Sequence, residues 1–126
     1  MIVGTGVDIT EVKRIQAAVE RFGQRFLKRV FTPAELRYCM AKPNASERLA
    51  ARFAAKEAGM KAIGTGLRHG VSWQDVEVVR FPGQRPELQF HGKAAEFAAR
   101  LGCKRTHLSL SHTKEQAIAH VILESI

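Results

Sequence analysis

The chain has 126 residues, of which 45% are hydrophobic and 25% charged, and its formal net charge is +8. This size predicts a single domain, residues 1–126, with a modest core, and no apolar run approaches the roughly 20 residues that span a membrane. Because the first residues lack the pattern of a signal peptide, we expect a soluble cytoplasmic protein, and the charge indicates a polyanionic partner: nucleic acid, a phosphate-rich cofactor or an acidic protein.

The first predicted elements are a strand over 2–9 and a helix that starts at Glu11 and ends near Gly23. Gly4 and Gly6 in the strand mark places where another backbone or a ligand approaches closely. The helix and the residues after it carry a concentration of positive charge. This charge is either a solvated helix face or a docking surface for an acidic partner. The basic residues are Lys13, Arg14, Arg21, Arg25, Lys28 and Arg29.

Two capping patterns predict the next two helices. The Thr-Pro-Ala-Glu segment at 32–35 predicts a short helix through Met40. The Asn-Ala-Ser-Glu segment at 44–47 repeats the pattern and predicts a long helix that runs to Ile63 and stops at Gly64.

The long helix places a carboxylate among apolar residues. At helical spacing, Glu57 shares one stripe with Leu49, Phe53 and Met60. Burying an unpaired carboxylate costs several kcal/mol or more, so Glu57 needs a cation, hydrogen-bond donors or a raised pKa. Gly59 costs about 1 kcal/mol of helix propensity relative to alanine, which predicts a looser helix at that point.

Gly64 and Thr65 belong to a Gly-Thr-Gly turn that follows the long helix. Dinucleotide fingerprints and P-loops use the start of a helix, so this turn is neither. A helix stop is the simpler interpretation, although the turn could offer backbone N–H groups to an anion held by Lys61.

The rest of the chain predicts two strand pairs and one helix. The first pair covers 75–81 and 87–91, the helix covers 93–101, and the second pair covers 105–112 and 116–123. The first strand pair suggests a hairpin.

Ser111 and His112 are adjacent on a predicted strand, so they point to opposite faces, which argues against a nucleophilic Ser-His pair. We expect a structural strand whose hydroxyls and His112 are free to bind an anion. Cys39 and Cys103 follow no metal-ligand or redox spacing, so we expect two unpaired thiols without a role.

Asp8 and Glu57 are carboxylates on two rigid elements that we expect to pack together. Two hard oxygen ligands, with room for water and substrate phosphates, fit magnesium better than zinc. Two other interpretations stay open: Asp8 caps the helix near Glu11, and Glu57 pairs with a nearby lysine or arginine.

Three blocks in order together resemble the 4'-phosphopantetheinyl transferases, and the chain length resembles their small trimeric class. The blocks are Gly6-Val7-Asp8, Arg52-Phe53-Ala54-Ala55-Lys56-Glu57-Ala58 with Lys61, and Ser109-Leu110-Ser111-His112. The resemblance implies a compact α+β fold, a homotrimer with active sites between subunits, and Mg2+-dependent transfer of the phosphopantetheine arm of coenzyme A. The acceptor would be a serine of an acidic acyl carrier protein in fatty acid biosynthesis, and the other product adenosine 3',5'-bisphosphate.

The same resemblance assigns roles to individual residues. Asp8 and Glu57 would bind the metal, with Glu57 and Lys61 catalytic; either Glu57 or a metal-bound water would be the general base. Thr10 stands where larger relatives carry a second acidic residue, which implies a water ligand there. The residues expected along the coenzyme A site are Lys61, Gly64, Thr65, Ser111 and His112.

The basic first helix gains a role in docking the carrier protein, with Arg14, Arg21 and Arg25 as the expected contacts. Two alternative functions stay open: the same chemistry on a secondary-metabolite carrier, and a small basic nucleic-acid-binding module. The few aromatic residues form no stacking platform interleaved with basic residues, which weighs against nucleic acid.

Overall fold

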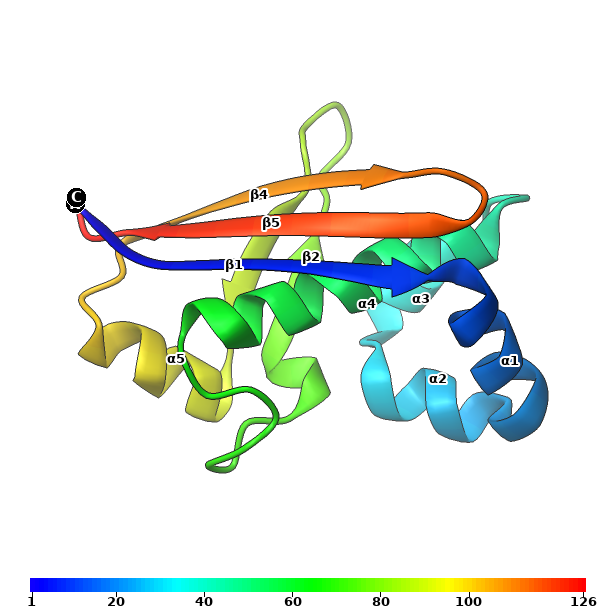
Figure 1. The fold of residues 1–126 in the computed structure, drawn as a ribbon, viewed down its shortest axis with the longest axis horizontal. Helices are drawn as coiled ribbons and strands as arrows, with labels where there is room; N and C mark the ends of the chain where they lie inside the picture. Colours follow the sequence, from blue (N-terminus) through cyan, green and yellow to red (C-terminus); the bar gives the residue numbers. More distant parts are fainter.

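The computed structural model describes residues 1–126 and places a three-stranded antiparallel sheet along a long helix, α4 (Ala45–Ala62) (Figure 1). The strands are β1 (Ile2–Glu11), β4 (Arg105–His112) and β5 (Gln116–Glu124), in the order β1-β5-β4. β5 is therefore central, and β1 and β4 are the two edges. One face of the sheet packs on α4, whereas no helix covers the other face (Figure 1).

Four shorter helices surround α4. α1 (Val12–Phe22), α2 (Gln24–Val30) and α3 (Pro33–Met40) gather near its start, and α5 (Gly92–Arg100) lies near its end (Figure 1). The α+β class that the sequence predicts is confirmed. No helix in the structure combines the length and the hydropathy needed to cross a membrane.

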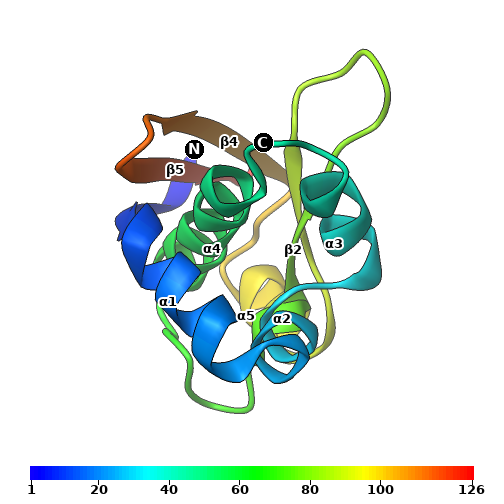
Figure 2. The same ribbon diagram turned by 90° about the vertical axis from the view of Figure 1, so that its right-hand side faces the viewer.

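A separate antiparallel hairpin lies beside β4. It consists of β2 (Val76–Val79) and β3 (Glu87–Phe90), and a 3₁₀ turn at Trp73–Asp75 leads into it. The hydroxyl of Thr106 in β4 donates a hydrogen bond of 2.9 Å to the carbonyl of Leu88 in β3. The loop between β2 and β3 projects away from the body of the molecule (Figure 2).

Two glycines of β1 allow the strand to lie directly on the backbone of α4. A Cβ atom at Gly4 would collide with the carbonyl oxygen of Ala62, and one at Gly6 with that of Ala58. The close approach expected at these glycines is confirmed, and the approaching group is backbone. As a result, Asp8 lies against the last turns of α4.

The core surrounds α4 on nearly all sides, because twelve of its eighteen residues are buried. Glu57 lies at the margin of this core and is partly buried, whereas the fully buried charge on the helix is its neighbour Lys56. Lys56 Nζ lies 2.8 Å from Glu35 Oε1 and donates to the carbonyls of Trp73 at 3.1 Å and Val76 at 2.7 Å. The ammonium group of Lys56 thus has three partners, one for each of its N–H bonds.

Gly59 does not loosen α4, which continues without a break to Ala62, so that prediction is wrong. A Cβ atom at Gly59 would lie 2.8 Å from Val76 Cγ1 and 3.0 Å from Leu88 Cδ2. The missing side chain allows the β2–β3 hairpin to pack against the helix.

The predicted capping patterns have different outcomes. In α3, Thr32 Oγ1 accepts a hydrogen bond from the Glu35 N–H and Glu35 Oε1 accepts one from the Thr32 N–H, which confirms the capping box. In α4, Asn44 makes no side-chain cap; its Oδ1 accepts a 2.9 Å bond from Arg48 Nε instead. No helix is predicted for 24–30, but α2 lies there.

Candidate active site

Asp8 on β1 and Glu57 on α4 form a pair of neighbouring carboxylates at the β1 edge of the sheet. Burial, followed by the negative charge of Asp8, raises the pKa of Glu57 to about 7. Asp8 Oδ2 is buried and has no hydrogen-bond partner. Two adjacent carboxylates with an unpartnered buried oxygen are typical of a cation-binding site.

The two alternative interpretations of these carboxylates are not supported. Asp8 does not cap α1, because the helix has Glu11 at its N-cap position and Asp8 Oδ1 accepts a 3.1 Å bond from the Ile9 N–H. Glu57 forms no ion pair with a lysine or arginine within 4 Å, whereas Lys61 Nζ lies 3.3 Å from Asp8 Oδ1.

The donor set at this edge fits a hard cation such as Mg2+. Thr10 lies two residues beyond Asp8 on the same strand, and its Oγ1 is a second buried oxygen without a partner. The structure contains no cluster of three or more His, Cys, Asp or Glu side chains. Two carboxylates suit Mg2+, which retains several waters and takes substrate oxygens, better than they suit Zn2+.

Arg14 joins this acidic pair to a pocket at α1 and α2. Its positive charge opposes the rise in the pKa of Glu57, and its guanidinium carbon lies 5.1 Å from the centre of the Phe53 ring. The pocket has a volume of about 400 Å³, and five of its eight lining residues are hydrophobic. Its lining residues are Arg14, Phe22, Arg25, Phe26, Arg29, Val30, Phe53 and Trp73.

The three arginines expected to dock an acidic partner are not equivalent. Arg14 and Arg25 line the pocket at α1 and α2, but Arg21 does not. The guanidinium carbon of Arg21 instead lies 5.2 Å from the centre of the Phe22 ring. Arg14 and Arg25, together with Arg29, therefore give this pocket a basic margin, and Arg14 links it to the carboxylate pair.

The Gly-Thr-Gly turn closes α4 as the simpler interpretation predicts. The N–H groups of Thr65 and Gly66 both donate to the carbonyl of Met60, and that of Gly64 donates to the carbonyl of Lys61. These donors already serve the helix end, which favours the helix-stop interpretation. The ammonium group of Lys61 remains available, because its side chain is 57% exposed.

Ser111 and His112 do not join the acidic pair. They lie on β4, and β5 separates them from β1, which carries Asp8. His112 Nδ1 lies 3.2 Å from Glu47 Oε1. Within one chain the residues expected along the coenzyme A site are therefore divided between opposite edges of the sheet.

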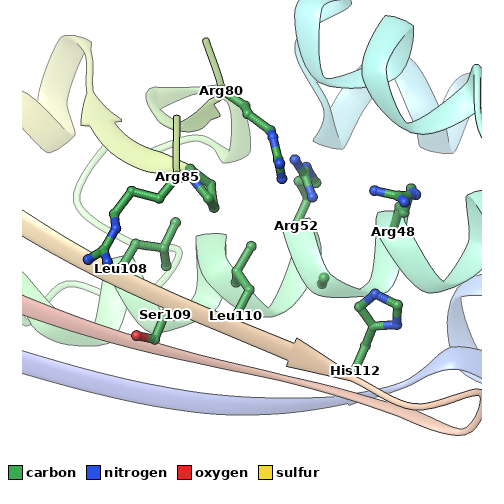
Figure 3. A pocket seen from close by; sticks show the side chains of 10 residues that line it. Arg48, Arg52, Arg80, Arg85, Leu108, Ser109, Leu110 and His112 are labelled. Carbon is green, nitrogen blue, oxygen red and sulfur yellow. The ribbon is translucent and has the colours of Figure 1, made fainter. Parts of the chain in front are cut away.

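A pocket at the β4 edge gathers four arginines (Figure 3). Arg48 and Arg52 come from α4, Arg80 follows β2, and Arg85 lies in the projecting loop. Together with His112 they line a cavity of about 360 Å³, which we call the arginine pocket.

The arginine pocket carries positive charge that no carboxylate neutralises. None of its four arginines lies within 4 Å of a carboxylate oxygen. Arg52 is only 5% exposed, and its Nε has no hydrogen-bond partner. Guanidinium groups match phosphate oxygens in geometry and charge, so the pocket is suited to a phosphate group.

The chain matches known proteins over nearly its whole length. A sequence model of the 4'-phosphopantetheinyl transferase superfamily matches residues 4–121. The chain is 64% identical to a holo-[acyl-carrier-protein] synthase from Koribacter versatilis over 98% of this chain and 99% of that protein. Its fold resembles the holo-[acyl-carrier-protein] synthase of Neisseria meningitidis, with a TM-score of 0.88, 36% identity and coverage of 98% and 99%. It also resembles that of Helicobacter pylori in complex with coenzyme A, with a TM-score of 0.83, 31% identity and coverage of 95% and 99%.

Proposed function

Because the chain belongs to the holo-[acyl-carrier-protein] synthases of the 4'-phosphopantetheinyl transferase superfamily, we propose that it modifies an acyl carrier protein of fatty acid biosynthesis. The serine oxygen of the carrier forms a bond to the phosphorus that bears the pantetheine arm of coenzyme A. The bond from that phosphorus to the bridging oxygen breaks, and adenosine 3',5'-bisphosphate leaves. The observation that carries this proposal is the Asp8–Glu57 pair with its unpartnered oxygen.

Asp8 and Glu57 would hold Mg2+. When bound, the ion would neutralise charge on the pyrophosphate and favour departure of the bisphosphate. Lys61 lies one helical turn after Glu57 and contacts Asp8, so its exposed ammonium group can bind a pyrophosphate oxygen at this edge. The proton of the attacking serine must also be taken up here. Glu57 is the carboxylate of the pair that is not already in contact with a lysine.

The arginine pocket would bind the remaining phosphate of coenzyme A, the 3'-phosphate. This group is a monoester with nearly two negative charges, which suits several guanidinium groups that lack carboxylate partners. Arg52 supports this assignment because it is almost fully buried and still has an unpartnered Nε. His112 lines the same pocket.

A single chain does not present both halves of this site to one ligand, because the halves lie at opposite edges of the sheet. The uncovered face of the sheet exposes three large apolar side chains: Val7, Ile9 and Ile118 are 52%, 56% and 41% exposed. Burial of this face against other copies would remove an exposed hydrophobic patch. We therefore propose a homotrimer in which the β4 edge of one subunit completes the site at the β1 edge of the next.

The carrier protein would dock beside the metal site. Arg14 and Arg25 form a basic margin around a mostly apolar pocket, and an acidic protein with apolar contact residues would match both features. The attacking serine would then lie next to Glu57, because the charge of Arg14 acts on that residue.

The reaction is tested by incubating the protein with apo acyl carrier protein, coenzyme A and Mg2+ and measuring the intact mass of the carrier. We expect the mass gain of one phosphopantetheine group, and loss of that gain with Glu57→Gln or after chelation of the metal. No gain with several folded carriers would contradict the proposed function.

The divided site is tested by mixing subunits. Glu57→Gln alters the β1 edge, and Arg80→Glu combined with Arg85→Glu alters the arginine pocket at exposed positions. If the two halves come from different subunits, co-refolded mixtures will contain some intact sites and will exceed the activity of both parents. Mixtures that equal the average of the parents would place the whole site within one chain.

A further inference from the structure

Three guanidinium groups of the arginine pocket surround one aromatic ring, that of Tyr38 on α3. The distances from the ring centre are 4.4 Å to Arg52 Cζ, 5.3 Å to Arg48 Cζ and 5.5 Å to Arg80 Cζ. The ammonium group of Lys42 lies 5.9 Å from the same centre. Four cations from three parts of the chain thus share a single ring.

The hydroxyl of Tyr38 makes a further contact with this group. It accepts a hydrogen bond of 2.7 Å from Arg48 Nη1, while Arg48 Nε donates to Asn44 Oδ1 at 2.9 Å. Arg48 is therefore fixed by one partner on its own helix and by one on α3.

Tyr38 lies behind the arginine pocket and does not line it. The ring lines a neighbouring cavity of about 350 Å³, and Arg52 and Arg80 line both cavities. A phosphate in the arginine pocket would contact the guanidinium groups, whereas Tyr38 would contact the same groups from the other side.

The ring of Tyr38 offsets the electrostatic repulsion between the arginines of the arginine pocket. Positive groups at close range repel one another, and no carboxylate within 4 Å offsets this repulsion for Arg48, Arg52 or Arg80. The face of an aromatic ring is electronegative and attracts cations without neutralising them. A tyrosine can therefore hold the arginines together and leave their full charge for an anion, which a carboxylate in its place would not do.

We propose that Tyr38 is the positioning residue of the arginine pocket and sets the affinity for the 3'-phosphate of coenzyme A without touching the ligand. This inference rests on the proposed function, because that function assigns the 3'-phosphate to the arginine pocket. Tyr38 acts only through Arg48, Arg52 and Arg80, so its effect disappears when the ligand lacks that phosphate.

The test compares coenzyme A with 3'-dephospho-coenzyme A as ligands of the wild type, Tyr38→Phe and Tyr38→Leu. Tyr38→Leu removes ring and hydroxyl, and we expect its dissociation constant for coenzyme A to rise about tenfold, the scale of a lost cation–π group. Tyr38→Phe removes only the hydroxyl, and we expect a rise of about threefold. For 3'-dephospho-coenzyme A both variants stay within about twofold of the wild type, because the arginines then have no phosphate to bind.

A spectroscopic measurement provides an independent readout, because Tyr38 is the only tyrosine of the chain. Protein labelled with 13C-tyrosine gives the ring signals of one residue. We expect coenzyme A to shift these signals and 3'-dephospho-coenzyme A to leave them nearly unchanged. Shifts of equal size with both ligands would contradict the proposed link.

Phe97→Leu is the matched control for loss of a partly buried aromatic ring. Phe97 on α5 also carries a guanidinium group, with Arg100 Cζ 4.9 Å from the ring centre, but neither residue lines the arginine pocket. We expect this variant to bind both ligands like the wild type. Thermal unfolding of all variants identifies any that are not folded at the assay temperature.

The outcomes separate the inference from the function on which it rests. If Tyr38→Leu weakens the binding of both ligands equally, or of neither, Tyr38 is not the positioning residue. If the wild type binds both ligands equally, the assignment of the 3'-phosphate is wrong and the inference fails with it. Absence of phosphopantetheine transfer by the wild type would contradict the proposed function alone, since the binding comparison still decides the role of Tyr38.

Discussion

Lys56 and Glu35 form an ion pair of 2.8 Å, Nζ to Oε1, in which neither side chain is exposed to solvent. The second carboxylate oxygen of Glu35 accepts a 2.8 Å hydrogen bond from the N–H of Val78. Burial lowers the pKa of Lys56, and the charge of Glu35 opposes that effect. The pair joins α3, α4 and β2 at the centre of the molecule.

We expect Lys56→Met to lower the free energy of unfolding by about 3–5 kcal/mol, because the carboxylate of Glu35 would stay buried without a countercharge. Adding Glu35→Gln should restore part of the loss, since neither member of the pair is then charged. Urea unfolding of both single variants and the double variant measures the coupling. If the double variant loses more unfolding free energy than the two single variants together, this account is contradicted.

Gly59→Ala should destabilise the protein although alanine is the better helix former. The new Cβ atom would lie 2.8 Å from Val76 Cγ1, and Val76 is fully buried and cannot move aside. We expect a loss of about 1–3 kcal/mol, as for other overpacked cores. Val76→Ala in the same chain provides room for the methyl group, so the double variant should lose less than the two single changes together; thermal unfolding decides this.

Arg25→Glu should weaken the binding of the carrier protein without weakening the binding of coenzyme A. Arg25 lines the mostly apolar pocket at α1 and α2, away from the arginine pocket. We expect the KM for acyl carrier protein to rise about tenfold at low salt and the KM for coenzyme A to stay nearly unchanged. Arg100→Glu on α5 is the matched charge reversal outside both pockets and should change neither constant. Equal increases in both constants for Arg25→Glu would exclude a docking role.

Cys39 should make the folded protein sensitive to alkaline pH. Burial raises the pKa of the Cys39 thiol to about 11 from its model-compound value of 9.0. Above pH 9 the unfolded chain loses this proton while the folded protein retains it, so stability falls as the pH rises from about 9 to 11, by about 2–3 kcal/mol in all. Cys39→Ala should remove this dependence and Cys103→Ser should preserve it, as measured by urea unfolding across that range. Identical alkaline profiles for both variants would contradict the assignment.

The elements were predictable where local signals are strong. The strand over 105–112 has the predicted bounds, and the long helix expected at 44–63 occupies Ala45–Ala62. α2 was not predictable in this way, because it has only seven residues and its boundary depends on Gly23, which also ends α1. Helical periodicity does not predict which residues of α4 are buried, because a helix that is buried on almost every side has no single apolar stripe.

The candidate site was predictable only in its first half. Asp8 and Glu57 meet as expected, because each stands on a rigid element and glycines bring the two elements together. The arginine pocket could not be predicted from spacing, because Arg52 and Arg85 come from segments that share no local motif. Arg52 lies within the recognised block, but its sequence does not reveal that it is buried without a partner.

The pairing of β1 with β5 also determines when the carboxylate site can form. Asp8 lies opposite Ala119, and the ammonium group of Met1 donates to the carbonyl of Ile126, so the first strand is completed by the last. Contacts between such distant segments require the closure of a long loop, which slows folding. During synthesis the first strand therefore stays without its neighbour in the sheet until nearly the whole chain has been made, because β5 is the last strand of the chain.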